Sequence, residues 1–263
     1  MKQSIVITGS TRGIGYGLVD EFLKRECQVL LNGRSQESVD AALAALSDRH
    51  GTDRIAVQAG DVVVPDVHEA IWAAAVAAFG KVDIWINNAG VGHPYLMGWE
   101  IPTEKIDQVV DINLKGMIYG SQVAVRRMLQ QGFGHLYNME GFGSNGRIRP
   151  GLSVYGSTKS ALSYFTRSLA AEVEGTPVKV SSLSPGMVIT DFITEQYQDD
   201  PEGFEQTKAA FNALGDKVET VTPWLADQVL ANDKSGAAIK WLTTPKIMTR
   251  LAIARFNKRD LFD

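Results

Sequence analysis

The sequence predicts an α/β protein in which a parallel sheet carries helices on both of its faces. Six apolar runs of strand length recur along the chain, and segments with the periodicity of amphipathic helices lie between them. The runs cover residues 5–7, 29–31, 55–57, 82–86, 135–139 and 178–183, and the clearest helical segments cover 18–23, 70–79, 109–129 and 161–173. Strands that alternate with helices in this way are joined by right-handed crossovers, which gives a single doubly wound, Rossmann-type sheet.

The composition is that of an ordinary folded protein. The chain has 263 residues, of which 44% are hydrophobic and 21% charged, and no linker or repeat divides it, so we predict one domain over residues 1–263. A net charge of −4 provides no broad basic field, so nucleic acid is not an expected partner. A single cysteine and four histidines without ligand spacing predict no disulfide and no metal site.

The N-terminal residues leave no room for a targeting peptide, because the first strand-like run begins at Ser4 and reaches a glycine turn by Gly9. No segment approaches the roughly 20 consecutive apolar residues that cross a bilayer. We therefore expect a soluble, cytoplasmic protein.

Two C-terminal segments depart from the alternating pattern. Residues 191–235 form an expected irregular insertion over the carboxyl edge of the sheet, where it would cover a substrate. Its aromatic residues either line a wide apolar mouth or form the core of a lid; they are Phe192, Tyr197, Phe204, Phe211 and Trp224. Residues 240–263 form a basic amphipathic tail, which either docks on its own domain or a partner subunit, or contacts a membrane surface or an anionic ligand.

A glycine-rich turn follows the first strand. Gly9, Gly13 and Gly15 allow the backbone and the start of the next helix to approach a pyrophosphate. An NAD site would have an acidic residue after the second strand, whereas this chain has Arg34 there and Arg12 in the glycine turn. Two cations suit the 2′-phosphate of NADPH. The alternative is that Arg34 is only a solvated residue at the start of a helix. The predicted contacts in these turns are Gly9, Ser10, Arg12, Gly13, Ile14, Gly15, Arg34 and Ser35.

Tyr155 and Lys159 are four residues apart and project from the same face of a helix. A phenol has a pKa near 10, and a neighbouring cation favours its phenolate form, which brings proton exchange closer to neutral pH. The pair gains meaning from four further motifs: Gly60-Asp61-Val62, Asn87-Asn88-Ala89-Gly90, Asn113 and Pro185-Gly186. With the glycine turn, they follow the order and spacing of the short-chain dehydrogenases/reductases, a family that the chain resembles as far as about Thr190.

The resemblance implies a set of functional residues. Tyr155 would be the general acid, Lys159 would hold the nicotinamide ribose and lower the pKa of Tyr155, and Asn113 would anchor a water that relays protons to Lys159. Further contacts with NADPH would come from Asp61, Val62, Asn88, Ala89, Gly90, Tyr155, Lys159, Pro185, Gly186, Val188 and Thr190. The family's two long helices, here about 109–130 and 155–174, would pair in a homodimer or homotetramer.

One family position is altered. The family has Asn-x-Ser-Ser at the end of the fifth strand, and its second serine polarises the substrate carbonyl, whereas this chain has Gly141 there. We expect Ser144, eleven residues before Tyr155, to take over this catalytic role; a backbone N–H or Asn145 is the alternative. Glu140 would orient Ser144 or cap the turn. His93, in the loop after the fourth strand, would border the substrate or be a solvated loop residue.

The same segment narrows the resemblance to one branch of the family. An Asn-Met-acidic-Gly-x-Gly-Ser string at 138–144 and the tail pattern at 235–245 resemble the chlorophyll b reductases. This implies NADPH-dependent reduction of the 7-formyl group of chlorophyll(ide) b, a bulky tetrapyrrole, with peripheral membrane contact through the basic tail. A general aldehyde/ketone or 3-oxoacyl reductase for another bulky substrate, or a non-catalytic NADPH-binding sensor, are the alternatives.

Overall fold

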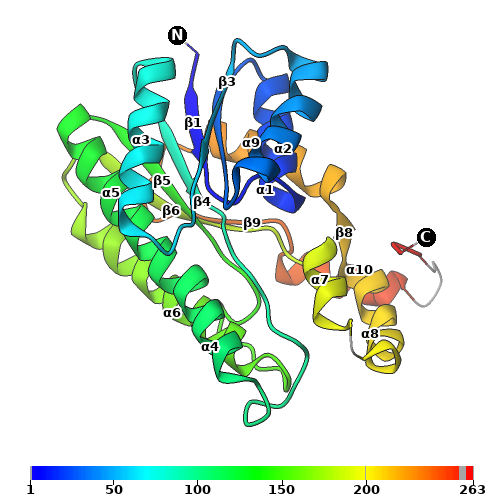
Figure 1. The fold of residues 1–263 in the computed structure, drawn as a ribbon. Helices are drawn as coiled ribbons and strands as arrows, with labels where there is room; N and C mark the ends of the chain where they lie inside the picture. The colour runs from blue at the N-terminus through cyan, green and yellow to red at the C-terminus, as the bar shows by residue number, and fades with distance from the viewer. Residues whose placement is uncertain (1, 199, 255–258, 263) are drawn as a thin grey trace.

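A seven-stranded parallel sheet runs through the centre of the computed structural model, which describes residues 2–198, 200–254 and 259–262. The strand order is β3-β2-β1-β4-β5-β6-β9 (Figure 1). Successive strands are therefore added toward one edge of the sheet from β1 to β3 and toward the other edge from β4 onward. The strands are β1 (Ser4–Ile7), β2 (Gln28–Gly33), β3 (Ile55–Ala59), β4 (Ile84–Asn87), β5 (Gly134–Met139), β6 (Val178–Ser184) and β9 (Ala238–Lys240). The predicted doubly wound α/β class is confirmed.

Helices cover both faces of this sheet, as Figure 1 shows. On one face lie α1 (Gly13–Lys24), α2 (Gln36–His50) and α9 (Val218–Ala231), and on the other lie α3 (Pro65–Phe79), α5 (Met117–Gln131) and α6 (Ser153–Glu172). Alternate residues of a strand point to opposite faces, so in β1 the side chains of Ile5 and Ile7 enter the first core and Val6 enters the second. Because both faces are covered, three of the central strands contain runs of consecutive buried apolar residues, at 5–7 in β1, 29–31 in β2 and 84–86 in β4.

Local signals set the ends of these helices. The side chain of Ser35 caps α2 by accepting from the N–H of Ser38, at 3.3 Å. Helix α3 begins with Pro65 at its first position and ends at Gly80, which has φ +80°. A left-handed Gly132 ends α5 in the same way.

The predicted helix at 109–129 proves to be three pieces. It begins within α4 (Thr103–Val110), continues through a π-helical segment at Asp111–Gly116 and ends in α5. Single π turns inside α-helices are often found at functional sites, and Asn113 lies in this one.

The expectation that residues 191–235 form one irregular insertion over the substrate was wrong. Helix α7 (Asp191–Gln196) and α8 (Pro201–Leu214) do extend beyond the carboxyl edge of the sheet (Figure 1). Helix α9, in contrast, packs against α1 in the first core, because Val221, Leu225 and Val229 form a fully buried stripe at helical spacing. A second, two-stranded sheet of β7 (Val188–Ile189) and β8 (Asp216–Lys217) joins the two parts.

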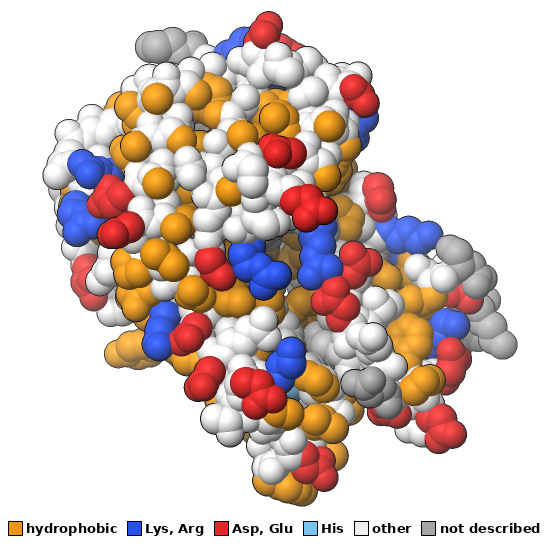
Figure 2. Space-filling model, viewed as in Figure 1, with side chains coloured by type: hydrophobic (Ala, Val, Ile, Leu, Met, Phe, Trp, Pro, Cys, Tyr) orange, Lys and Arg blue, Asp and Glu red, His pale blue; other side chains and the backbone are white. Residues whose placement is uncertain are grey.

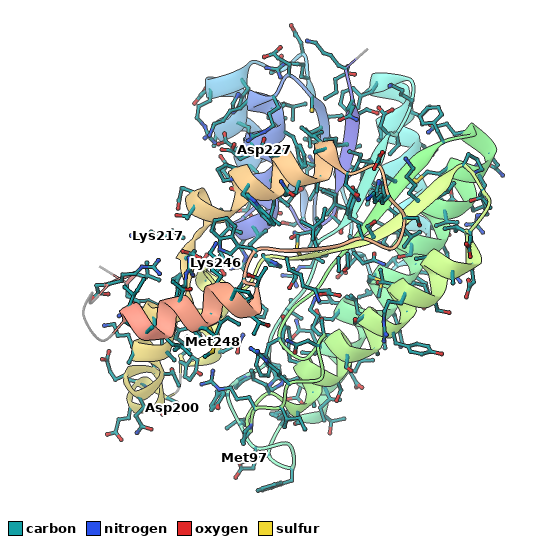
Figure 3. All side chains as sticks on the ribbon, turned by 180° about the vertical axis from the view of Figure 1, so that it is seen from behind. Met97, Asp200, Lys217, Asp227, Lys246 and Met248 are labelled. Carbon is teal, nitrogen blue, oxygen red and sulfur yellow. The ribbon has the colours of Figure 1, made fainter. Side chains whose placement is uncertain are left out.

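The basic tail docks on its own chain. Arg250 of α10 (Thr244–Ile253) and Arg259 pair with the buried Asp216, at 2.7 and 3.1 Å. The ring of Phe262 packs against Phe204 of α8, with centroids 5.0 Å apart. Figure 3 shows α10 from behind, with Lys246 and the exposed Met248 on it. Positions 255–258 of the predicted basic segment lie outside the described residues.

Acidic and basic side chains are interspersed over the face of the molecule drawn in Figure 2. No helix among the described residues is both long and apolar enough to cross a membrane.

Candidate active site

The turn after β1 and the loop after β4 are held together at the carboxyl edge of the sheet. Thr8 Oγ1 accepts from the N–H groups of Asn88 and Ala89, at 3.0 and 3.2 Å. The Asn88 amide in turn donates to the carbonyls of Thr8 and Gly9, at 3.0 and 2.8 Å. The two predicted cofactor-binding segments therefore form one rigid unit.

Two glycines make this close packing possible. Gly9 has φ +59°, and a Cβ there would lie 2.7 Å from the Ala89 Cα. A Cβ on Gly15 would lie 2.5 Å from the Asn88 amide nitrogen. Helix α1 begins directly after this turn, and the first N–H groups of a helix have no partner within it, so this cradle fits the pyrophosphate of a dinucleotide.

Asn32, at the end of β2, organises the neighbouring turns and was missed by the sequence analysis. Its side chain accepts from the N–H of Gly9, at 3.2 Å, and donates to the carbonyls of Gln58 and Gly60, at 2.9 and 3.2 Å. The signal was an asparagine at the end of an otherwise apolar strand, where a buried amide needs partners.

The residues predicted for the adenosine end have different surroundings. Arg34 is exposed, and among the described residues it makes no ion pair. The side chain of Ser35 is used as the cap of α2. Asp61 accepts from the N–H of Val63, at 3.1 Å, and thereby fixes the turn after β3.

Arg12, in the glycine turn, is paired with the insertion. Its Nη1 lies 2.6 Å from Glu195 Oε1 and 3.6 Å from Asp191 Oδ2, both in α7. Thr190, just before α7, also faces the turn, because a Cβ on Gly13 would lie 3.6 Å from its Cγ2. The start of the insertion therefore contacts the predicted cofactor site.

Tyr155 and Lys159 lie in the first turns of α6 and are almost completely buried, with 9% and 4% of their surface exposed. Lys159 Nζ donates to the carbonyl of Met139, at 3.2 Å, and stands 5.8 Å from the centre of the Tyr155 ring. Burial lowers the pKa of Lys159 to about 8, and the charge of Glu140 opposes that shift.

Burial also raises the pKa of Tyr155 well above its ordinary value. The expected lowering of this pKa by Lys159 is not seen in this arrangement, because the ammonium is directed at the Met139 carbonyl instead of at the phenol oxygen. Tyr155 is accordingly a protonated phenol at neutral pH.

Asn113 is fully buried and joins the loop after β4 to the π-helical segment. Its Oδ1 accepts from the N–H of Val91 at 2.8 Å, and its Nδ2 donates to the Val91 carbonyl at 2.9 Å. A Cβ on the adjoining Gly90 would lie 3.3 Å from Asn113 Oδ1 and 3.7 Å from Lys159 Nζ. The structure thus brings Asn113, Lys159 and Tyr155 to one edge of the sheet.

Ser144 has partners that do not suit the role expected for it. Its hydroxyl donates to the carbonyl of Lys159, at 3.1 Å, and accepts from the N–H of Gly141, at 3.2 Å. Since a hydroxyl has one proton, this arrangement does not support polarisation of a substrate carbonyl by Ser144. The alternative, Asn145, accepts from the N–H of Arg147. A Cβ on Gly141 would clash with the Tyr155 hydroxyl, so this glycine lies directly against the phenol oxygen.

His93 is a second residue whose role the sequence did not reveal. The expectation of a solvated loop histidine was wrong, because only 2% of its surface is exposed. Its Nε2 accepts from the N–H of Tyr155 at 3.3 Å, and its Nδ1 lies 2.7 Å from the Pro94 carbonyl. An N–H can only donate and a carbonyl can only accept, so in this arrangement Nδ1 carries a hydrogen and Nε2 is an acceptor.

Among the described residues, the Glu140 side chain neither contacts Ser144 nor caps the turn. Its Oε1 accepts from the hydroxyl of Ser163, at 3.4 Å, and so links the end of β5 to α6.

The aromatic residues of the insertion have three different kinds of surroundings. Phe192 packs against Tyr155, with its ring centre 5.5 Å from that of Tyr155. Tyr197, Phe204 and Phe211 pack on one another and form a lid core. Trp224 packs against Trp241, at 5.4 Å, away from this cluster.

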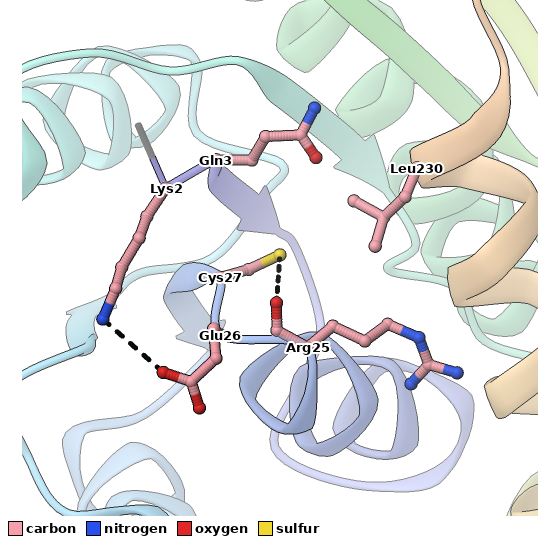
Figure 4. A pocket seen from close by; sticks show the side chains of 6 residues that line it. All are labelled: Lys2, Gln3, Arg25, Glu26, Cys27 and Leu230. Carbon is pink, nitrogen blue, oxygen red and sulfur yellow. Dashed lines mark hydrogen bonds and ion pairs between the residues drawn. The ribbon is translucent and has the colours of Figure 1, made fainter.

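A hollow of about 480 Å³ at the amino ends of β1 and β2 lies away from these residues (Figure 4). It is lined by Lys2, Gln3, Arg25, Glu26, Cys27 and Leu230. Burial raises the pKa of the Cys27 thiol, which makes it unreactive. In the described ranges, no group of three His, Cys, Asp or Glu side chains is placed to hold a metal ion.

Comparisons with known proteins give the class. The family model described as short chain dehydrogenase matches residues 3–201. The solved structure "ElxO with NADP Bound" superimposes with a TM-score of 0.80 at 22% identity and covers 94% of this chain and 100% of that one. The chain belongs to the short-chain dehydrogenase family and is an oxidoreductase of the nicotinamide-dependent kind.

Two curated relatives from Arabidopsis thaliana are more specific. The chain is 33% identical over 277 residues to a probable chloroplastic chlorophyll(ide) b reductase, covering 99% of this chain and 55% of the relative. It is 35% identical over 257 residues to a second chloroplastic chlorophyll(ide) b reductase, covering 94% of this chain and 72% of the relative. The chain therefore spans about half the length of the first relative and most of the second.

Proposed function

We propose that this protein is an NADPH-dependent carbonyl reductase that converts the 7-formyl group of chlorophyll(ide) b to a hydroxymethyl group. The observation that carries the proposal is the convergence of Tyr155, Lys159 and Asn113 beside a dinucleotide cradle, in a chain similar to two chlorophyll(ide) b reductases. The same geometry suits a general aldehyde or ketone reductase. The choice of chlorophyll(ide) b as the substrate therefore rests on the two relatives alone.

The residues at the carboxyl edge fit a bound nicotinamide cofactor. Gly9, Gly13 and Gly15 would hold its pyrophosphate and Lys159 its nicotinamide ribose. When bound, the reduced nicotinamide supplies the hydride for the formyl carbon. Tyr155, kept protonated by burial, donates its phenolic proton to the carbonyl oxygen. Asn113 and Lys159 lie behind Tyr155, where they would return a proton to it.

The preference for NADPH rests on charge. Arg12 and Arg34 flank the expected position of the adenosine ribose, and neither position offers a carboxylate for the ribose hydroxyls. A 2′-phosphate would compete with Glu195 and Asp191 for Arg12.

An assay of the purified chain with chlorophyllide b tests the proposal. We expect a 7-hydroxymethyl product with NADPH, much less with NADH, and none from the Tyr155→Phe variant, which should still bind NADPH. Turnover of simple aldehydes but not of the pigment would favour the general reductase. Binding of NADPH without turnover of any carbonyl would favour a non-catalytic sensor.

We also propose a homo-oligomer that pairs through α5 and α6, whose outer faces expose Leu129 and Tyr164. Location in the cytoplasm and peripheral membrane contact through α10 stay predictions. Met248 and Leu251 are exposed on that helix, in keeping with such contact.

A further inference from the structure

Arg149 occupies an unusual position for a cation. It is half-buried, and its Nε and Nη2 donate to the hydroxyls of Tyr95 and Tyr197, at 3.1 and 3.3 Å. Its guanidinium lies 5.2 Å from the centre of the Tyr95 ring. No carboxylate among residues 2–198, 200–254 and 259–262 pairs with it.

This cluster has more donors than acceptors. A guanidinium has five N–H groups, of which Arg149 uses two here. The Tyr95 hydroxyl spends its proton on the Pro150 carbonyl, at 2.7 Å, whereas the Tyr197 hydroxyl donates to no acceptor among the described residues. The unused donors of a guanidinium beside an aromatic ring suit a planar anion such as a carboxylate.

The cluster lies at the far end of the helix that covers Tyr155. Phe192, near the start of α7, packs against Tyr155, and Tyr197 immediately follows the end of α7. At the rise of an α-helix, the backbone positions of Phe192 and Tyr197 are five residues, or about 8 Å, apart along the axis. Tyr95 lies in the loop after β4. Its backbone N–H donates to the carbonyl of Gln196, at 2.9 Å, and so holds the C-terminal end of α7.

We propose that Arg149, with the Tyr197 hydroxyl, binds a carboxylate of the substrate while the carbonyl lies at Tyr155. The proposal rests on the proposed function and deepens it, because the macrocycle carries its propionate side chain across from the ring that carries the formyl group. Free chlorophyllide b has this carboxylate, whereas an esterified pigment does not. The tail is less suited to the role, since Arg250 and Arg259 are already paired with Asp216.

The test compares kcat/KM for chlorophyllide b with kcat/KM for its methyl ester, in which the charge is lost and the size is nearly kept. We expect the natural chain to favour the acid by about tenfold, as a charge-assisted pair implies. Arg149→Met should bring the ratio close to one, and Arg149→Lys should keep part of it, because an ammonium retains the charge without the planar fork. A general loss of folded enzyme lowers both rates alike and cancels in the ratio.

Arg147→Met is the matched control, because Arg147 is exposed and only two residues away. It should keep the preference of the natural chain. Equal use of acid and ester by the natural chain, or an unchanged preference in Arg149→Met, overturns the Arg149 site and leaves the proposed function standing. Reduction of neither pigment overturns both.

Discussion

The backbone N–H of Tyr155 donates to Nε2 of His93, a bond of 3.3 Å between the first turn of α6 and the loop after β4. The first N–H groups of a helix have no partner within the helix, so His93 satisfies one of them from outside. It thereby fixes the turn of backbone that carries the phenol.

His93→Leu should destabilise the protein, because it leaves the Tyr155 N–H buried without an acceptor. We expect the free energy of unfolding to fall by about 1–3 kcal/mol in urea titrations. His93→Gln offers an amide oxygen in the same region and should recover part of the loss. Equal stability of His93→Leu and the natural chain would show that this bond contributes nothing.

Gly141→Ala should impair catalysis with little effect on cofactor binding. The new methyl group would clash with the Tyr155 hydroxyl and move it. We expect turnover to fall at least tenfold, since a small displacement of a catalytic group is costly, and NADPH affinity to change less than twofold. Gly156→Ala is the control, because a Cβ there meets nothing within 4 Å. Normal turnover in Gly141→Ala would show that Gly141 does not lie against the Tyr155 hydroxyl as described.

The burial of Lys159 predicts a pH dependence of stability in the cofactor-free protein. Its pKa is about 8 when folded and near 10.5 when unfolded, so between these values the unfolded chain binds more protons. Stability from this residue therefore rises with pH over that window, by about 1 kcal/mol per pH unit. Urea titrations at pH 8 and pH 9.5 should show this rise in the natural chain and its absence in Lys159→Met. A rise of the same size in both proteins would show that Lys159 is not the source of the pH dependence.

Glu195→Gln should strengthen NADPH binding. The substitution removes the charge that pairs with Arg12 at 2.6 Å, which leaves the guanidinium available to a 2′-phosphate. Exposed pairs contribute up to about 1 kcal/mol, so the Kd for NADPH should fall by up to about fivefold. The Kd for NADH should not change, and Glu205→Gln, on the exposed surface of α8, should change neither. A parallel change for both cofactors would rule out competition for Arg12.

Much of the fold was predictable because apolar runs mark strands that are buried on both faces. All six predicted strands are present. The seventh, β9, was missed because only Ile239 of its three residues is even partly buried, so no apolar run marks it. The burial of α9 was missed because no strand of the main sheet lies between β6 and α9 in the sequence. Without alternating strands, the sequence does not indicate that this helix packs on the sheet.

The candidate site was predictable to the extent that its residues lie at strand ends or on one helix face. Tyr155, Lys159 and Asn113 were predicted from such positions and from the resemblance to the family. The partners of Ser144 and His93 were not, because they depend on how a glycine-rich turn and a loop fold back on α6. A side chain that bonds to a distant backbone group leaves no periodic signal in the sequence.

Transfer of deuterium is the most direct test of the central claim. NADPH labelled at the hydride position of its nicotinamide would be incubated with chlorophyllide b and the purified chain, and the pigment analysed by mass spectrometry. The account predicts one deuterium on the new hydroxymethyl carbon with the natural chain and none with Tyr155→Phe. An unlabelled hydroxymethyl product, or unchanged pigment with the natural chain, would contradict it.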